Sequence, residues 1–151
     1  MFKKILYPVD FSDYAEEILE YAVAMATQFG GELHLIHVIS NLSYFTPSEA
    51  FLTQENMADI ERNIEAEVEK DYGKLTKNLK MPVKKVIKIG ITFVEIIDYA
   101  RKEGIDLIVM GTHGRGAIEH ILIGSVAERV VRKAPCPVLT IRPEGMKFTM
   151  P

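Results

Sequence analysis

The sequence predicts a single α/β domain built on a parallel sheet. Short, uniformly apolar runs alternate along the 151 residues with longer segments whose apolar positions recur at helical spacing. The chain is long enough for one core, and its 48% hydrophobic and 26% charged residues are typical of a globular domain. Strands that alternate with helices form right-handed βαβ units, which favours a three-layer sandwich with helices on both faces of the sheet.

The first three elements are expected to form one βαβ unit. Residues 5–9 are a continuous apolar run, which predicts a buried strand. Ser12 is expected to cap the helix that follows, and Gly30 and Gly31 are expected to end it. Residues 33–39 predict the second strand.

The middle of the chain predicts a long helix and an edge strand. Apolar residues form one stripe over about residues 47–79, and the remaining face is rich in Glu and Lys. We interpret that face as a solvated surface in preference to a partner surface. Residues 83–89 predict the third strand, whose three lysines favour a place near the sheet edge.

The next helix and strand begin with a capping-box spacing. Thr92 and Glu95 have this spacing at the start of a helix that Gly104 is expected to end. Residues 105–110 predict the fourth strand, and Asp106 near its start is interpreted as a structural hydrogen-bonding residue.

The last helix and strand repeat the pattern. Ser125 and Glu128 have capping-box spacing, Pro135 stops the helix, and residues 138–141 predict the fifth strand. The helix is expected to bury Ala127, Val130, Val131 and Ala134. The first and fourth strands are the most uniformly apolar, so we expect them at the centre of the sheet.

The glycine-rich segment between the fourth strand and the last helix has features of an anion-binding loop. Gly111 and Gly114 are expected to adopt positive φ and to let a ligand approach the backbone. Gly124 and Ser125 open a helix whose first amide N–H groups have no intrahelical partners and so attract phosphate. If the first and fourth strands are neighbours, the ligand crevice lies between Val9-Asp10 and Met110-Gly111.

Standard phosphate motifs do not fit this segment. The sequence holds no Gly-Lys-Ser or Gly-Lys-Thr, and Glu119 stands where the dinucleotide fingerprint requires glycine. His113 and Arg115 are candidates to add charge or hydrogen bonds near a phosphate. Two interpretations stay open at this point: phosphate binding, or glycines that only permit a sharp strand-to-helix connection.

Composition excludes several other classes. The formal net charge of −3 gives no electrostatic reason to expect nucleic acid or an anionic membrane as partner. No apolar run is long enough to span a bilayer, and the single Cys136 is interpreted as a small core residue. We therefore expect a cytoplasmic protein. His34 and His37 are interpreted as packed or partly exposed, and they form no metal-ligand spacing with His120.

Several stretches together resemble the universal stress protein family. They are Gly111-x2-Gly114-x9-Gly124-Ser125, the strand and loop over 106–114, the run 134–139, and the opening 5–10. The resemblance covers nearly the whole chain and implies a five-stranded parallel sheet of order 3-2-1-4-5, Rossmann-like and similar to the adenine nucleotide alpha hydrolases. It also implies a universal stress protein domain over 1–143, a C-terminal tail over 144–151, and membership of the branch that binds ATP.

The resemblance assigns twelve residues to an adenine-nucleotide site. Those implied near adenine and ribose are Pro8, Val9, Asp10, Val38, Met110 and Gly111. Those implied around the phosphates are Gly114, Arg115, Gly124, Ser125 and Val126, with His113 near ribose and phosphates. Each has a structural alternative: Asp10 as a cap of the first helix, Ser125 as the cap of its own helix, and Val38 and Met110 as core residues.

A nucleotide-binding stress or signalling module with slow or no turnover is favoured over an ATP hydrolase or phosphotransferase. Only Arg115 and Ser125 are evident beside the phosphates, and phosphoryl transfer needs more than these. We expect ATP, or AMP or ADP, with Mg²⁺ or Mn²⁺ bridging the phosphates and no metal ligands from protein side chains. A structural homodimer with an unoccupied nucleotide site is the third alternative. The resemblance implies a homodimer through the edge strand Val138–Ile141.

Overall fold

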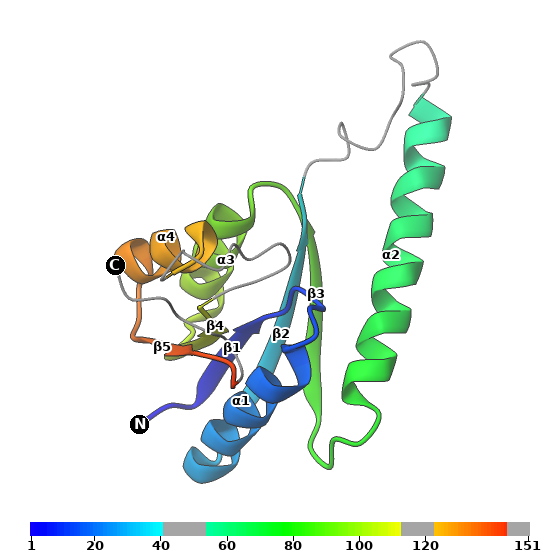
Figure 1. Cartoon of the computed structure of the whole chain (residues 1–151). Coiled ribbons are helices and arrows are strands. Elements are labelled where there is room, and N and C mark those ends of the chain that lie inside the picture. The colour runs from blue at the N-terminus through cyan, green and yellow to red at the C-terminus, as the bar shows by residue number, and fades with distance from the viewer. Residues whose placement is uncertain (41–53, 113–122, 145–151) are drawn as a thin grey trace.

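The five strands form one parallel sheet in the order β3-β2-β1-β4-β5, as the resemblance implies (Figure 1). The computed structural model describes residues 1–40, 54–112 and 123–144. Strands β1 and β4 lie side by side inside the sheet, so the prediction that both are interior is confirmed, and β3 and β5 are its edges. The strands are β1 (Lys4–Pro8), β2 (Glu32–Ile39), β3 (Val83–Ile89), β4 (Leu107–Gly111) and β5 (Val138–Ile141).

The helices cover both faces of this sheet, which makes the expected three layers (Figure 1). One apolar cluster joins α1 (Ala15–Phe29) and α2 (Gln54–Thr76) to one face. A second cluster joins α3 (Thr92–Glu103) and α4 (Ser125–Lys133) to the other. Within the described ranges, no helix is long and apolar enough to cross a membrane.

The three predicted N-terminal caps are wrong, whereas Gly30 and Gly104 end α1 and α3 as expected. Helix α1 begins at Ala15 with Tyr14 at the N-cap, while Thr92 and Ser125 are the first helical residues of α3 and α4. No side chain caps these three helices. A capping hydroxyl must stand one position before the helix on extended backbone, and a residue already in the first turn cannot reach the same amides.

Two expectations of burial also need correction. Val131 is 49% exposed, because Ala127 and Val130 form the face of α4 that meets the sheet and Val131 lies about 100° around the helix from Val130. Cys136 is only half-buried, packed at the margin of the α3–α4 cluster, and burial raises the pKa of its thiol. The predicted helix over 47–79 is described only from Gln54 and ends at Thr76.

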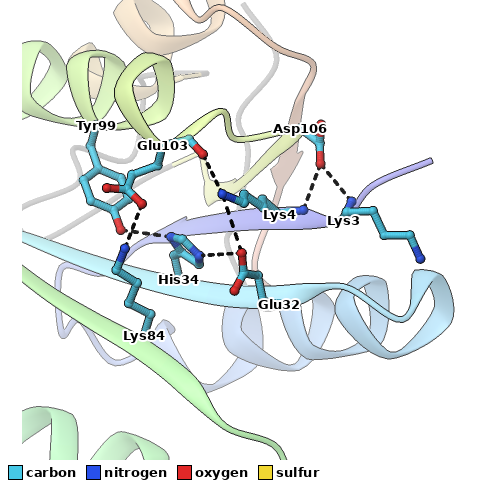
Figure 2. Close-up of polar contacts among 8 residues, drawn as sticks. All are labelled: Lys3, Lys4, Glu32, His34, Lys84, Tyr99, Glu103 and Asp106. Carbon is cyan, nitrogen blue, oxygen red and sulfur yellow. Dashed lines mark hydrogen bonds and ion pairs between the residues drawn. The ribbon is translucent and has the colours of Figure 1, made fainter.

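A polar cluster lies where the strands begin, at the end of the sheet opposite their carboxyl ends (Figure 2). His34 is 1% exposed; its Nδ1 lies 2.9 Å from the Tyr99 hydroxyl, and its Nε2 faces Glu32 Oε1 at 3.5 Å without a hydrogen bond. Lys84 and Glu103 close the cluster with an ion pair of 2.7 Å. Burial of the ring lowers the pKa of His34, against the opposing influence of Glu32.

Asp106 has the structural role that the sequence predicts. Its Oδ2 accepts hydrogen bonds from the backbone N–H groups of Lys3 and Lys4, both at 2.9 Å (Figure 2). These two bonds hold the pKa of the carboxyl below its usual range. Asp106 therefore joins the start of β1 to the residue before β4, and β4 itself begins at Leu107, two positions later than predicted.

Candidate functional site

A cavity of about 960 Å³ lies at the carboxyl ends of the strands. Its walls come from the ends of β1, β2 and β4, from α2, and from the first turns of α3 and α4. This is where ligands bind in open parallel sheets, next to the point where strand order reverses. The structure places nine of the twelve predicted residues on its lining: Pro8, Val9, Asp10, Val38, Met110, Gly111, Gly124, Ser125 and Val126. His113, Gly114 and Arg115 lie outside the described residues.

The end of β1 is fixed to β2. The amide of Val9 donates to the Ile36 carbonyl at 2.8 Å, and His37 Nδ1 lies 2.7 Å from the Val9 carbonyl oxygen. Because a carbonyl can only accept, His37 carries its proton on Nδ1 in this contact. These two hydrogen bonds hold the backbone at Val9, and the next residue, Asp10, lines the cavity.

Asp10 makes a local turn instead of capping a helix. Its Oδ1 accepts the Ser12 amide at 3.0 Å, and α1 begins three residues after Ser12. Such Asx turns fix a carboxylate relative to its own backbone. The alternative that Asp10 caps the first helix is therefore wrong, and within the described residues this is the carboxylate's one hydrogen bond.

The first turn of α4 lines the cavity and has amides without an acceptor inside the helix. The Gly124 amide donates to the Thr112 carbonyl at 2.7 Å, so it is already satisfied. The next three residues, Ser125, Val126 and Ala127, line the cavity, and their amides have no intrahelical acceptor. With no side-chain cap at this end, the amides and the positive end of the helix dipole favour an anion.

The glycines of this region act differently from the sequence-based expectation. Gly111 ends β4 and is not among the glycines with positive φ, and Gly124 has φ −62° and ψ 152°. Both conformations are open to other residues, so backbone strain gives no reason for glycine here. What distinguishes the two positions is the absence of a side chain at a surface that lines the cavity.

The cavity is lined by both helix dipoles and carboxylates. The first turn of α4 offers backbone amides, whereas Asp10 and, from α2, Glu67 and Asp71 bring carboxylates, and that of Asp71 also pairs with Lys74 at 2.8 Å. No group of three or more His, Cys, Asp or Glu that could hold a metal ion occurs in the described part of the chain. An anion is thus favoured at the first turn of α4, and a hydrogen-bond donor beside the carboxylates.

Comparison with known proteins identifies the family. Residues 1–142 match the model of the Universal stress protein family. The chain belongs to this family. Universal stress protein MJ0577 of Methanocaldococcus jannaschii is 35% identical over 94% of this chain and 96% of its own length. The solved structure of MJ0577 gives a TM-score of 0.80 at 34% identity, covering 96% of this chain and 99% of that one.

The same fold recurs in a more distant universal stress protein. A crystal structure of a universal stress protein in complex with cAMP covers 93% of this chain and 97% of its own, with a TM-score of 0.64 at 19% identity. This likeness shows the shared fold.

Several residues that line the cavity of this universal stress protein were not predicted from the sequence. Thr92 and Ile96 reach it from α3, Phe11 from the β1–α1 connection, and Glu67 and Asp71 from α2. No binding motif marks these positions, because each belongs to an ordinary amphipathic pattern, a turn or, for Thr92, a capping-box spacing. His37 was expected to be packed or partly exposed; it is half-buried and also lines the cavity.

Proposed function

We propose that this universal stress protein binds an adenine nucleotide, ATP in the first instance, in the cavity at the carboxyl ends of its strands. The observation that carries the proposal is the uncapped first turn of α4, which faces the same cavity as Asp10 and Val38. The amides of Ser125 and Val126 are suited to phosphate, and Gly124 gives it access. His113, Gly114 and Arg115 are proposed as further phosphate-side residues.

The other end of the cavity suits the base and ribose. Val38 and Met110 offer apolar surface, and Pro8, Val9 and Gly111 complete the walls. Asp10 is a hydrogen-bond acceptor, which fits a ribose hydroxyl or the amino group of adenine. A universal stress protein of the same fold has been crystallised with cAMP, and this supports the ligand class.

We propose binding with slow or no turnover. Phosphoryl transfer requires a positioned base and charge stabilisation around the transferred group. Asp10 is assigned to the adenosine, and the described residues at the first turn of α4, Ser125 and its neighbour Thr112, offer hydroxyl groups but no base or cation. Mg²⁺ or Mn²⁺ is proposed to bridge the phosphates, with its remaining ligands from water.

We also propose a homodimer through β5 in the cytoplasm. Strand β5 is an edge of the sheet, and an unpaired apolar edge strand favours pairing with a second copy. Val138→Lys or Leu139→Lys is expected to shift the protein toward monomer in light scattering. A variant that stays dimeric would exclude this interface.

The nucleotide proposal is tested by mass spectrometry of small molecules released from purified, acid-denatured protein, followed by calorimetric titration with ATP and Mg²⁺. Gly124→Val is expected to abolish binding without unfolding the protein, since valine can adopt the backbone angles of Gly124. Gly73→Val is the matched control, because a Cβ at Gly73, in α2, meets nothing within 4 Å.

The fate of the nucleotide and the effect of Gly124→Val distinguish a binding module from a hydrolase. Bound or titratable ATP that persists supports a binding module. ATP that converts to ADP or AMP in step with protein concentration, but not with Gly124→Val, shows a hydrolase. Unchanged affinity in Gly124→Val, or no binding by the unmodified protein, refutes the phosphate-loop assignment.

A further inference from the structure

Phe11 stands in a backbone conformation that its side chain disfavours. Its φ is 52°, and it is the one non-glycine residue with positive φ among residues 1–40, 54–112 and 123–144. For a bulky residue the left-handed region is strained, and such strain persists only where the surroundings hold it. Phe11 directly follows Asp10, and both line the cavity.

The ring of Phe11 is held by two aromatic neighbours. Its centroid lies 4.8 Å from that of His37 and 5.2 Å from that of Tyr72, which it meets edge to face. Both neighbours are themselves fixed: His37 by the Val9 carbonyl, and the buried Tyr72 by hydrogen bonds to carbonyls of β2 and β3. The left-handed turn is therefore clamped between β2 and α2.

Phe11 lies between the two partners of the hydrogen bond that holds the Asp10 carboxylate. With φ of 52° at residue 11, the Ser12 amide lies 3.0 Å from Asp10 Oδ1. That bond occupies one carboxylate oxygen and fixes the rotamer of the side chain. Within the described residues Oδ2 has no hydrogen bond, which leaves it to a donor in the cavity.

We propose that Phe11 is a positioning residue: its clamped left-handed turn holds the Asp10 carboxylate in the orientation that accepts a hydrogen bond from the ligand. The inference rests on the proposed nucleotide site and adds the device that preorganises one of its acceptors. Residue 11 has two separable properties, its aromatic ring and its backbone angle. The ring supplies the clamp, whereas the backbone angle is one that glycine adopts without strain.

Two substitutions exploit this separation. Phe11→Gly keeps the turn accessible and removes the clamp, so the Asp10–Ser12 turn is expected to fluctuate while the fold stays intact. Phe11→Tyr keeps the ring and its contacts. Phe2→Gly is the matched control: it removes an aromatic pair with Phe29 near the start of β1, away from the cavity.

The first measurement needs no nucleotide. Amide hydrogen exchange followed by NMR reports the Ser12 N–H, whose acceptor is Asp10 Oδ1. We expect its protection to fall in Phe11→Gly and to remain in Phe11→Tyr and Phe2→Gly. Protection that is unchanged in Phe11→Gly overturns the proposal, whether or not the protein binds ATP.

The second measurement is ATP–Mg²⁺ affinity by calorimetry. Phe11→Gly is expected to weaken binding about tenfold, the scale of one lost or misdirected hydrogen bond. Asp10→Asn measures the carboxylate, and in the double variant Phe11→Gly should add less than about twofold to the loss of Asp10→Asn. Full additivity overturns positioning through Asp10. Absence of ATP binding by the unmodified protein refutes the proposed function separately, because the exchange result stands by itself.

Discussion

Removing the hydroxyl of Tyr72 tests how α2 is held against the sheet. Tyr72 is 0% exposed, and its hydroxyl lies 3.2 Å from the Leu35 carbonyl oxygen and 2.9 Å from that of Val86. These carbonyls belong to β2 and β3, so one side chain of α2 contacts two strands. Tyr72→Phe deletes the donor and keeps the ring that packs on Phe11.

The expected loss follows from the number of hydrogen bonds. A neutral hydrogen bond contributes about 0.5–1.5 kcal/mol, and a buried group left unpaired costs about 1–3 kcal/mol. The two carbonyls share one donor, and each keeps a second lone pair, so we expect a loss of about 2 kcal/mol in the free energy of unfolding. For a domain of this size, that lowers Tm by roughly 4–8 °C.

Urea unfolding, monitored by circular dichroism, measures the loss in the free energy of unfolding. Differential scanning calorimetry measures the change in Tm. Tyr21→Phe is the matched control, because Tyr21 is 45% exposed and its substitution should stay within about 0.5 kcal/mol. A Tyr72→Phe variant as stable as the control would show that the two contacts to the strands contribute nothing to stability.

Three further substitutions test other features. The lowered pKa of His34 means that folding favours its neutral form, so stability should fall as pH drops below about 6.5, with a shallower slope in His34→Gln; equal slopes in thermal unfolding would exclude His34 as the cause. The pKa of Asp106 is lowered because hydrogen bonds favour its charged form, so its contribution to stability is also lost as the pH falls. Asp106→Ala should therefore destabilise the protein at pH 7, and the difference from the unmodified protein should shrink in strong acid, where the native carboxyl is also protonated. Gly31→Ala would place a Cβ 2.8 Å from the Phe2 carbonyl oxygen, so we expect a loss of about 1–3 kcal/mol in denaturant unfolding, and a neutral result would show that the chain relaxes there.

The sequence predicted element types well because apolar patterning reflects burial directly. Strands β3 and β5 have the predicted bounds, and α3 ends at Glu103 before Gly104 as expected. Capping was predicted wrongly because Thr92 and Ser125 fit a short pattern that says nothing about where extended backbone becomes helical. Val131 was predicted to be buried but is exposed, because the packing of α4 against the sheet decides which side chains of this short helix face the core.

The pattern of apolar runs predicts the α/β class, and the motifs shared with the universal stress proteins predict the strand order and nine residues that line the cavity. Alternating apolar runs and glycine positions are local properties, so they can be recognised in the sequence alone. Only the tertiary structure showed that nine predicted residues share one cavity, that α2 and α3 complete it, and that Phe11 is clamped in a left-handed turn. These features depend on contacts between segments far apart in the chain, such as Phe11 with His37 and Tyr72, and no periodicity of neighbouring residues encodes them.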